Sequence, residues 1–573
     1  MIRNSRQRVL IFFIVLVLWG TAFVPSSLTR TMTRSTTSTD VFSGKILFSP
    51  MDSKNTYVID STGTVTQTWS SGYTPYFSAY ELNDGTLLRT IKANFKEASH
   101  GGIELYASDG TVMWHYEYYS PGHYQTHHDI KALPNGHVLM IASETKTGSE
   151  AIAAGRNPSD LPDNMLEPDY IIEVEPTGPT SGTVVWEWHA WDHLIQDYDP
   201  TKPNYGTIEN HPELIDINFG VSEADWLHCN SIDYNPQFDQ ILLSFRNINE
   251  IWIIDHSTTT IEASSHSGGN SGHGGDILYR WGNPQTYRAG SVSNQKLFGQ
   301  HDATWIIPGL PGEGHILVFN NGVGRGYSSV DEIEPPVDAT GHYYLAPGSS
   351  YGPETQTWSY TATPPTSFYA DYISGAERLP DGNTLICDGP TGRFFEVTPE
   401  KTTIWQYVSP YPSPFLNRVF KIQYLPPQAP VPAVPDLKGI GSLSWANVKP
   451  GQTMNGNFQV QNIGDSGSLL NWTINCSSLD WGTWSIAPES GENLTPADGQ
   501  VTVYVTVVAP TQKNTQFEGY IRVENRDNST DFDVIPISLK TQTKTQLNVP
   551  IIEFLHNFFW SFPFFKILYK FFR

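Results

Sequence analysis

The sequence predicts an all-β protein, a six-bladed β-propeller followed by an immunoglobulin-like β-sandwich. Two observations predict the propeller: a short hairpin recurs along the chain, and so does a strand that ends in tryptophan. Strand repeats of roughly 40–50 residues are typical of propeller blades. A change of pattern after a proline-rich stretch predicts the sandwich. The composition agrees, because 17 Trp, 47 Gly and 41 Pro in 573 residues favour strands and turns over helices.

The recurring hairpin is clearest where His228–Pro236 is followed by Gln240–Arg246. Two short runs flank a turn there, the pattern of a β-hairpin with a slightly long loop. The same pattern begins at His128 and at His301. Three further copies lack the histidine; they span Phe77–Gly85, Ser374–Gly382 and Phe420–Pro427.

The closing strands of the repeat each carry a tryptophan: Trp69, Trp114, Trp186, Trp281, Trp358 and Trp405. The first unit, Lys45–Trp69, lacks an inner strand, whereas Arg418–Pro426 is an inner strand without a unit of its own. We predict that this last strand completes the first blade, which closes the ring and removes exposed sheet edges. Units two to four are longer than the others and are expected to carry insertions, where function tends to lie.

The remaining segments flank the predicted propeller of residues 41–427. Residues 1–25 contain Arg3, Arg6 and Arg8 before an uncharged run, Val9–Val24, which indicates an export signal or a signal anchor; cleavage stays open. A Ser/Thr-rich linker, 26–40, follows. A Pro-rich linker, 428–438, precedes the predicted sandwich, 439–541. We expect an exported protein, extracellular or at the cell surface and membrane-anchored if the segment is retained.

The tail at 546–573 is dense in Phe, Ile and Leu and ends with Lys566, Lys570 and Arg573. We interpret it as a segment that contacts a membrane surface or a partner, and a helix packed on the sandwich is the alternative. The net charge of −24 argues against nucleic acid as a partner.

In a propeller the inner strands line a central channel, so equivalent positions of six strands converge at one mouth. These positions are Phe77, His128, His228, His301, Ser374 and Phe420. Arg246 closes the hairpin that His228 opens, and antiparallel pairing places the two side by side. Any one of the histidines, taken alone, is expected to be a hydrogen-bonded structural residue. The coincidence of three at one register favours a site.

The three histidines are compatible with either a metal site or an anion site, and Arg246 favours the anion site. Imidazole is a common metal ligand, but a guanidinium would repel a cation. Neutral imidazole is a competent nucleophile, and arginine binds a tetrahedral anion through several donors. The set therefore favours transfer of a sulfuryl or phosphoryl group through a covalent histidine, without metal or cofactor.

Four stretches resemble the arylsulfate sulfotransferase family: Trp226–Ser231, His128–Ile130, Gly299–Ala303 and Asn320–Gly322. The resemblance covers about Val41–Pro427. It implies a six-bladed propeller that moves a sulfuryl group from a phenolic sulfate ester to a phenol through a sulfohistidine, without a nucleotide donor. Small aryl sulfates and phenols would be its partners.

The resemblance also implies roles for single residues. His301 would be the nucleophile, and His128, His228 and Arg246 would bind and polarise the sulfuryl oxygens. Asn230, Asn321, Phe77 and Phe420 are expected to contact substrate. The alternative is a non-catalytic surface protein for binding or adhesion that keeps the propeller as a scaffold.

Overall fold

A computed structural model of the chain describes residues 41–93, 100–161, 163–427 and 433–543. The chain divides into two compact units, residues 1–427 and 428–573. The segments predicted as signal (1–25), Ser/Thr-rich linker (26–40) and tail (546–573) lie outside the described residues. Within the described part, no helix is both long and apolar enough to cross a membrane.

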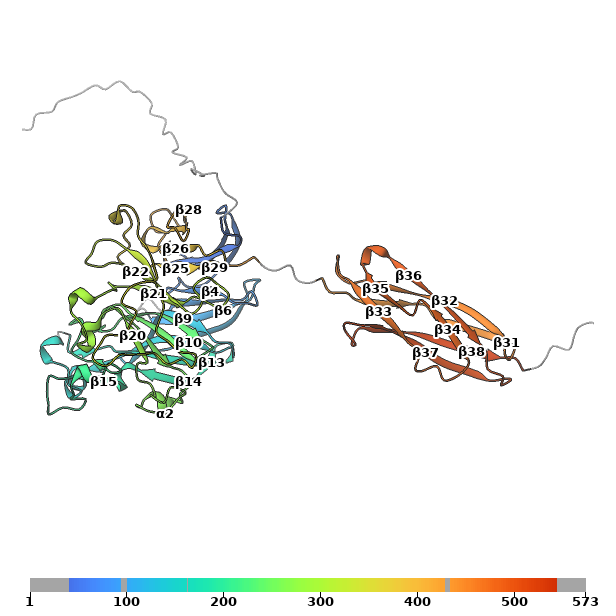
Figure 1. The fold of residues 1–573 in the computed structure, drawn as a ribbon, viewed down its shortest axis with the longest axis horizontal. Helices are drawn as coiled ribbons and strands as arrows, with labels where there is room; N and C mark the ends of the chain where they lie inside the picture. Colours follow the sequence, from blue (N-terminus) through green and yellow to red (C-terminus); the bar gives the residue numbers. More distant parts are fainter. Residues whose placement is uncertain (1–40, 94–99, 162, 428–432, 544–573) are drawn as a thin grey trace, which may run out of the picture. The chain divides into compact units, whose positions relative to one another are not determined.

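The first unit is a six-bladed β-propeller, with one curled sheet per blade (Figure 1). Blades 1 to 3 comprise β29 (Val419–Leu425), β1 (Lys45–Pro50), β2 (Asn55–Asp60) and β3 (Val65–Ser70); β4 (Ala79–Glu81), β5 (Leu87–Ala93), β6 (His100–Tyr106) and β7 (Val112–Glu117); and β8 (Tyr119–Ser120), β9 (Tyr124–Ala132), β10 (Val138–Glu144), β13 (Asp169–Gly178) and β14 (Ser181–His189). Blades 4 to 6 comprise β17 (Cys229–Asn235), β18 (Gln240–Phe245), β19 (Glu250–Asp255) and β20 (Tyr279–Trp281); β21 (His301–Trp305), β22 (Ile316–Asn320), β23 (Ser329–Ile333) and β24 (Trp358–Tyr360); and β25 (Gly375–Arg378), β26 (Thr384–Asp388), β27 (Arg393–Val397) and β28 (Thr403–Val408).

The last inner strand completes the first blade, as the sequence predicts. β29 pairs antiparallel with β1, so that Leu425 lies opposite Lys45. The pairing leaves β1 without a free edge and closes the ring.

Insertions lengthen blades 3 and 4 as expected, whereas the described part of blade 2, which was also expected to carry one, holds only its four strands. The insertions contain β11 (Lys146–Thr147), α1 (Gly148–Ala153), β12 (Met165–Leu166), the 3-10 turn η2 (Ala190–Asp192), β15 (Leu194–Ile195), β16 (Ile215–Asp216) and α2 (Thr260–Ala263). The hydrophobic core lies between neighbouring sheets; Ile141 of β10 and Leu243 of β18, for example, belong to one buried cluster. Each such side chain contributes about 1.5–3 kcal/mol when fully buried.

Polar side chains join neighbouring inner strands, which do not pair with one another. Asp129 accepts a hydrogen bond from the backbone of Ile232 in the next blade (3.3 Å), and Asp302 accepts one from Ala376 (3.0 Å). Lys421 of β29 reaches across to both carboxylates, at 3.1 Å from Asp129 and 2.7 Å from Asp302. These bonds satisfy backbone donors that no sheet ladder reaches, and they fix the inner strands relative to each other.

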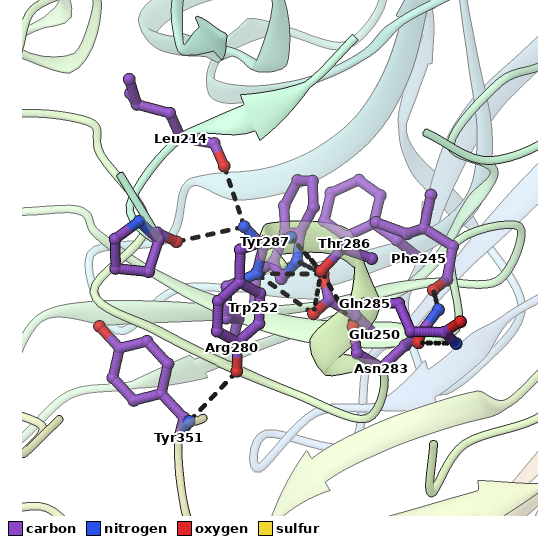
Figure 2. A network of polar contacts seen from close by, with 12 residues as sticks. Leu214, Phe245, Glu250, Trp252, Arg280, Asn283, Gln285, Thr286, Tyr287 and Tyr351 are labelled. Atoms are coloured by element: carbon purple, nitrogen blue, oxygen red, sulfur yellow. Dashed lines mark hydrogen bonds and ion pairs between the residues drawn. The ribbon is translucent and has the colours of Figure 1, made fainter. Parts of the chain in front are cut away.

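A buried ion pair holds the outer part of blade 4 (Figure 2). Arg280 of β20 contacts Glu250 of β19 at 2.5 Å and donates to the backbone carbonyl of Leu214 at 2.9 Å. The ring of Tyr287 lies against its guanidinium, 4.7 Å from the ring centroid. Because both charges are shielded from water and each has several partners, the pair joins β19 and β20 to the segments that contain Leu214 and Thr286.

The second unit contains two sheets around one hydrophobic core. The first has β30 (Leu437–Ile440), β32 (Thr453–Asn462), β34 (Thr483–Ala487) and β36 (Gln500–Val508); the second has β31 (Leu443–Val448), β33 (Leu470–Asn475), β35 (Ser490–Leu494), β37 (Gln516–Asn525) and β38 (Phe532–Thr541). β30 begins at Leu437, inside the segment 428–438 predicted as linker, because Leu437 is buried in this core. The immunoglobulin-like assignment stays a prediction.

Candidate active site

The side chains at the starts of the inner strands meet in one cluster. The ring of Phe77 stacks on His128 at 4.5 Å between centroids, and His128 meets His228 edge-on at 4.7 Å. Phe420 contacts Phe77 at 5.0 Å and His301 at 6.2 Å. The structure therefore brings together the five aromatic and imidazole groups that the repeat register selects. We call His128, His228, His301 and Arg246 the histidine ring site.

A bulge marks the inner strand at each of the three histidines. Residue pairing shifts between Met140 and Ala142 beside His128, and it shifts again after Cys229 and after His301. His128, His228 and Asp302 adopt left-handed backbone conformations, with φ of 56°, 56° and 51°. Such residues cost of order 1–3 kcal/mol each, and bulges redirect side chains near functional sites. His128 and His228 share this feature at one register, and in the blade of His301 it falls one residue later, at Asp302.

His301 has one ring nitrogen engaged and the other open. Asn321 donates both amide hydrogens to backbone carbonyls, of Ala370 and Ile373, each at 2.8 Å. Its Oδ1 therefore faces His301 Nδ1 at 2.8 Å as an acceptor, and the carbonyl of Gly299 lies 3.2 Å from the same nitrogen. Nδ1 must carry the hydrogen, so Nε2 holds the lone pair. Within the described residues, Nε2 has no hydrogen-bond partner.

A carboxylate and a second histidine orient His128. Asp169 lies 3.0 Å from Nε2 of His127, whose Nδ1 lies 2.8 Å from Nδ1 of His128. Burial alone would lower the pKa of His127, but the hydrogen bond to Asp169 and the charges of nearby carboxylates together outweigh it and raise the pKa. In its protonated form His127 donates to His128 Nδ1, and His128 then carries its own hydrogen on Nε2. This makes His128 a hydrogen-bond donor toward the site.

The third histidine pairs with a carboxylate of its own approach loop. His228 Nδ1 lies 2.5 Å from Asp225 Oδ2. Arg246 follows β18, and its backbone N–H donates to the carbonyl of His228 at 3.1 Å, which places it beside that histidine as predicted. Its Nη1 donates to Asn247 at 3.0 Å. Among the described residues its other guanidinium N–H groups have no partner, so they are available to an anion.

Burial is the main reason why two of the imidazoles stay neutral. Burial, with the nearby charges of His228 and Arg246, lowers the pKa of His301 to about 3, against the opposing effect of the hydrogen bond that its ring donates to Asn321. Burial and the surrounding histidines lower the pKa of His128 well below its usual range. Neutral His301 retains a nucleophilic lone pair throughout the physiological range, beside donors that attract an anion.

The lowered pKa of His301 predicts a pH-dependent loss of stability. Between about pH 6.5 and pH 3 the unfolded chain binds a proton at this residue that the folded chain does not, so stability falls as pH falls. Moving from pH 7 to pH 5 should cost about 2 kcal/mol through this residue. His301→Asn should therefore show a smaller drop in melting temperature between these pH values than the wild type. The exposed control His342→Asn should behave as wild type, and equal drops in all three proteins would contradict the assignment.

The other predicted contact residues lie at the same level but are enclosed. Asn230 is fully buried, and its Nδ2 donates to the carbonyl of Gln300 at 2.8 Å. Ser374 Oγ accepts a hydrogen bond from the backbone of Gly389 at 2.9 Å. Asn321 is also fully buried. Its Oδ1 accepts from His301, and its amide hydrogens go to backbone carbonyls. The roles of Asn230 and Asn321 in substrate contact stay predictions, and the geometry of Asn321 fits a positioning role.

Sequence reasoning missed the groups that hold the histidines. His127, Asp169 and Asp225 were not among the expected site residues, although each is in direct polar contact with a histidine of the site or with its neighbour. The paired His127–His128 and an aspartate three positions before His228 are visible signals. Asp169 lies on a different strand, and nothing in its local sequence distinguishes it.

Comparison with known families gives one match over most of the propeller. Residues 31–409 match the model of the family described as Arylsulfotransferase (ASST). No curated protein matches the chain.

Solved structures give distant matches. A protein of unknown function from Bacteroides caccae matches at 11% identity and a TM-score of 0.37, over 67% of this chain and 99% of that one. Virginiamycin B lyase from Staphylococcus aureus matches at 11% identity and a TM-score of 0.32, over 64% and 83%. A PapD-like domain of human CEP192 matches at 15% identity and a TM-score of 0.16, over 21% and 94%. None of these likenesses supports an assignment of function.

Proposed function

Because this chain belongs to the arylsulfotransferase family, we propose that it moves a sulfuryl group from a phenolic sulfate ester to a phenol through a sulfohistidine at His301. One observation carries the proposal. A neutral imidazole with an open Nε2 lies among three groups that can donate hydrogen bonds to an anion, His128, His228 and Arg246.

In the first half-reaction, Nε2 of His301 attacks the sulfur of the donor ester. A nitrogen–sulfur bond forms, the sulfur–oxygen ester bond breaks, and the phenolate leaves with the ester oxygen. His128 Nε2–H and the free guanidinium N–H groups of Arg246 bind the sulfuryl oxygens, where negative charge is concentrated. His228, held by Asp225, is placed to donate a proton to the departing phenolate.

The second half-reaction reverses these steps with a new phenol. The acceptor oxygen attacks sulfur, the nitrogen–sulfur bond breaks, and His228 takes the phenol proton. Asn321 holds Nδ1–H throughout, so that the lone pair returns to Nε2. One covalent intermediate serves both substrates, which implies ping-pong kinetics. No nucleotide sulfate donor is required in this scheme.

Turnover of a chromogenic aryl sulfate tests the proposal. With an added phenol as acceptor and no nucleotide present, the protein should release the coloured phenol at a rate that depends on the acceptor. Plots of reciprocal rate against reciprocal acceptor concentration, at several fixed donor concentrations, should give parallel lines. A strict requirement for a nucleotide sulfate donor would contradict the scheme. Failure of the folded protein to turn over a panel of aryl sulfates that it binds would favour the non-catalytic binding propeller.

A further inference from the structure

Two histidines and an aspartate converge at the outer junction of blades 3 and 4, away from the inner strands. His193 follows η2 after the last strand of blade 3, and His266 and Asp276 lie on the loop between α2 and β20 of blade 4. One potential ligand atom of each residue lies within 4.8 Å of the other two. His193 has no exposed side-chain surface and Asp276 has 6%, whereas His266 is 63% exposed.

The hydrogen bonds of His193 direct its Nδ1 at Asp276. Its Nε2 lies 2.8 Å from the backbone carbonyl of Ala263, which can only accept, so Nε2 carries the hydrogen. Nδ1 of a neutral ring then presents a lone pair, yet it faces the carboxylate oxygen Oδ1 of Asp276 at 2.8 Å. Two acceptors at this distance repel unless a proton or a metal ion lies between them. A metal-binding histidine commonly donates its other N–H to a backbone carbonyl in this way.

The third residue points at the same oxygen. Nδ1 of His266 lies 2.7 Å from Asp276 Oδ1. Two imidazole nitrogens and one carboxylate oxygen are the donor set of zinc and similar ions, with a fourth position left for water. Bonds of about 2.0–2.1 Å in a tetrahedral site would separate these ligand atoms by about 3.3 Å. The exposed ring of His266 can move outward by this amount, and a small turn of the Asp276 carboxylate would lengthen its distance from the buried His193.

The surroundings hold the buried ligand rigidly. Trp188 stacks on His193 at 5.8 Å between centroids, and its indole N–H donates to the carbonyl of Gly275 at 2.7 Å. A Cβ at Gly275 would lie 2.7 Å from His193 Nε2 and closer still to the carbonyl of Ala263, so only glycine fits there. The blade 4 loop thus packs closely against His193 at Gly275.

We propose that His193, His266 and Asp276 bind a divalent transition-metal ion, with zinc the best match, which ties the blade 4 loop to blade 3. Water fills the remaining position. This metal site is separate from the histidine ring site and does not depend on its chemistry.

Metal uptake by the full chain, prepared without a histidine tag and stripped with a chelator, tests this site. Titration with Co²⁺ should give a visible absorption band that saturates at one equivalent, and Zn²⁺ should displace it. His266→Ala should weaken binding at least about tenfold, since even outer-shell changes cost 10–100-fold. His266 is the residue to change because its exposed ring contributes little to folding. Zn²⁺ should also raise the melting temperature of the wild type more than that of His266→Ala.

His273→Ala is the matched control, because His273 is an exposed histidine of the same loop outside the three ligands. It should bind Co²⁺ as the wild type does. Equal binding by the wild type and His266→Ala would overturn the proposal, and so would the absence of a band in the wild type at 100-fold metal excess. In either case the three residues form a proton-linked ion-pair cluster. The Co²⁺ absorption band and the melting temperature do not depend on sulfuryl transfer. They therefore test the metal site even if the proposed function is wrong.

Discussion

Mixed with an aryl sulfate donor alone and quenched in base, the protein should carry a sulfuryl group on His301. His301→Asn should lose this label and nearly all turnover, because removal of a covalent nucleophile costs on the order of 10⁶-fold. His301 is expected over His128 and His228 because it lies in Gly299–Ala303, a stretch that resembles the family, and because burial lowers its pKa to about 3, which keeps Nε2 unprotonated. Mass spectrometry of the quenched protein locates the label.

The exposed His342→Asn serves as control and should retain both label and turnover. Label on His128 or His228 would move the nucleophile to that blade. Sequential kinetics without any labelled protein would rule out the covalent scheme and leave direct transfer, with the histidines acting as acid, base and anion ligands.

Arg246→Ala should reduce turnover by about 10²–10³-fold with little change in melting temperature. Loss of one charge-assisted contact to a transition-state oxyanion has a cost of this size. Folding should be spared because the side chain makes one hydrogen bond, to Asn247, while the backbone of Arg246 keeps its bond to His228. Initial rates and thermal melts of the same preparations measure both effects.

Arg246→Lys should lie between the wild type and Arg246→Ala, since lysine keeps the charge but not the planar fork of donors. Arg526→Ala is the matched control, because this exposed arginine pairs with Glu492 in the second unit. Unchanged turnover in Arg246→Ala would remove Arg246 from the site.

The arrangement of the ring could be predicted from the sequence because the repeat is regular. Six tryptophan-ending strands set the number of blades, and the unpaired strand at Phe420 could only complete the first blade. The same register selected His128, His228 and His301, and the hairpin rule placed Arg246 beside His228. The repeat thus predicted the number of blades, the closure of the ring and the positions of the histidines and Arg246.

The groups that orient the imidazoles could not be predicted in the same way. Asp302, directly after His301 in a strand whose side chains should alternate, binds Lys421. The bulges at the histidines break that alternation, and they depend on how blades meet. Asp169 reaches His127 from another strand, and the Asn321 amide is oriented by the carbonyls of Ala370 and Ile373, contacts that no single segment encodes. Neutrality of His301 follows from this packing, because burial is its first cause.

The pairing of β29 with β1 has a consequence for the order of folding. Synthesis delivers His128, His228, Arg246 and His301 long before it delivers Val419–Leu425. Until then β1 presents an open edge that invites association with other chains. Pairing of β1 with β29 joins the two ends of the propeller sequence, and such a non-local step is slow. A chain halted just short of Val419 would thus contain every residue proposed for chemistry. It would still lack β29, the strand that completes blade 1 and closes the propeller.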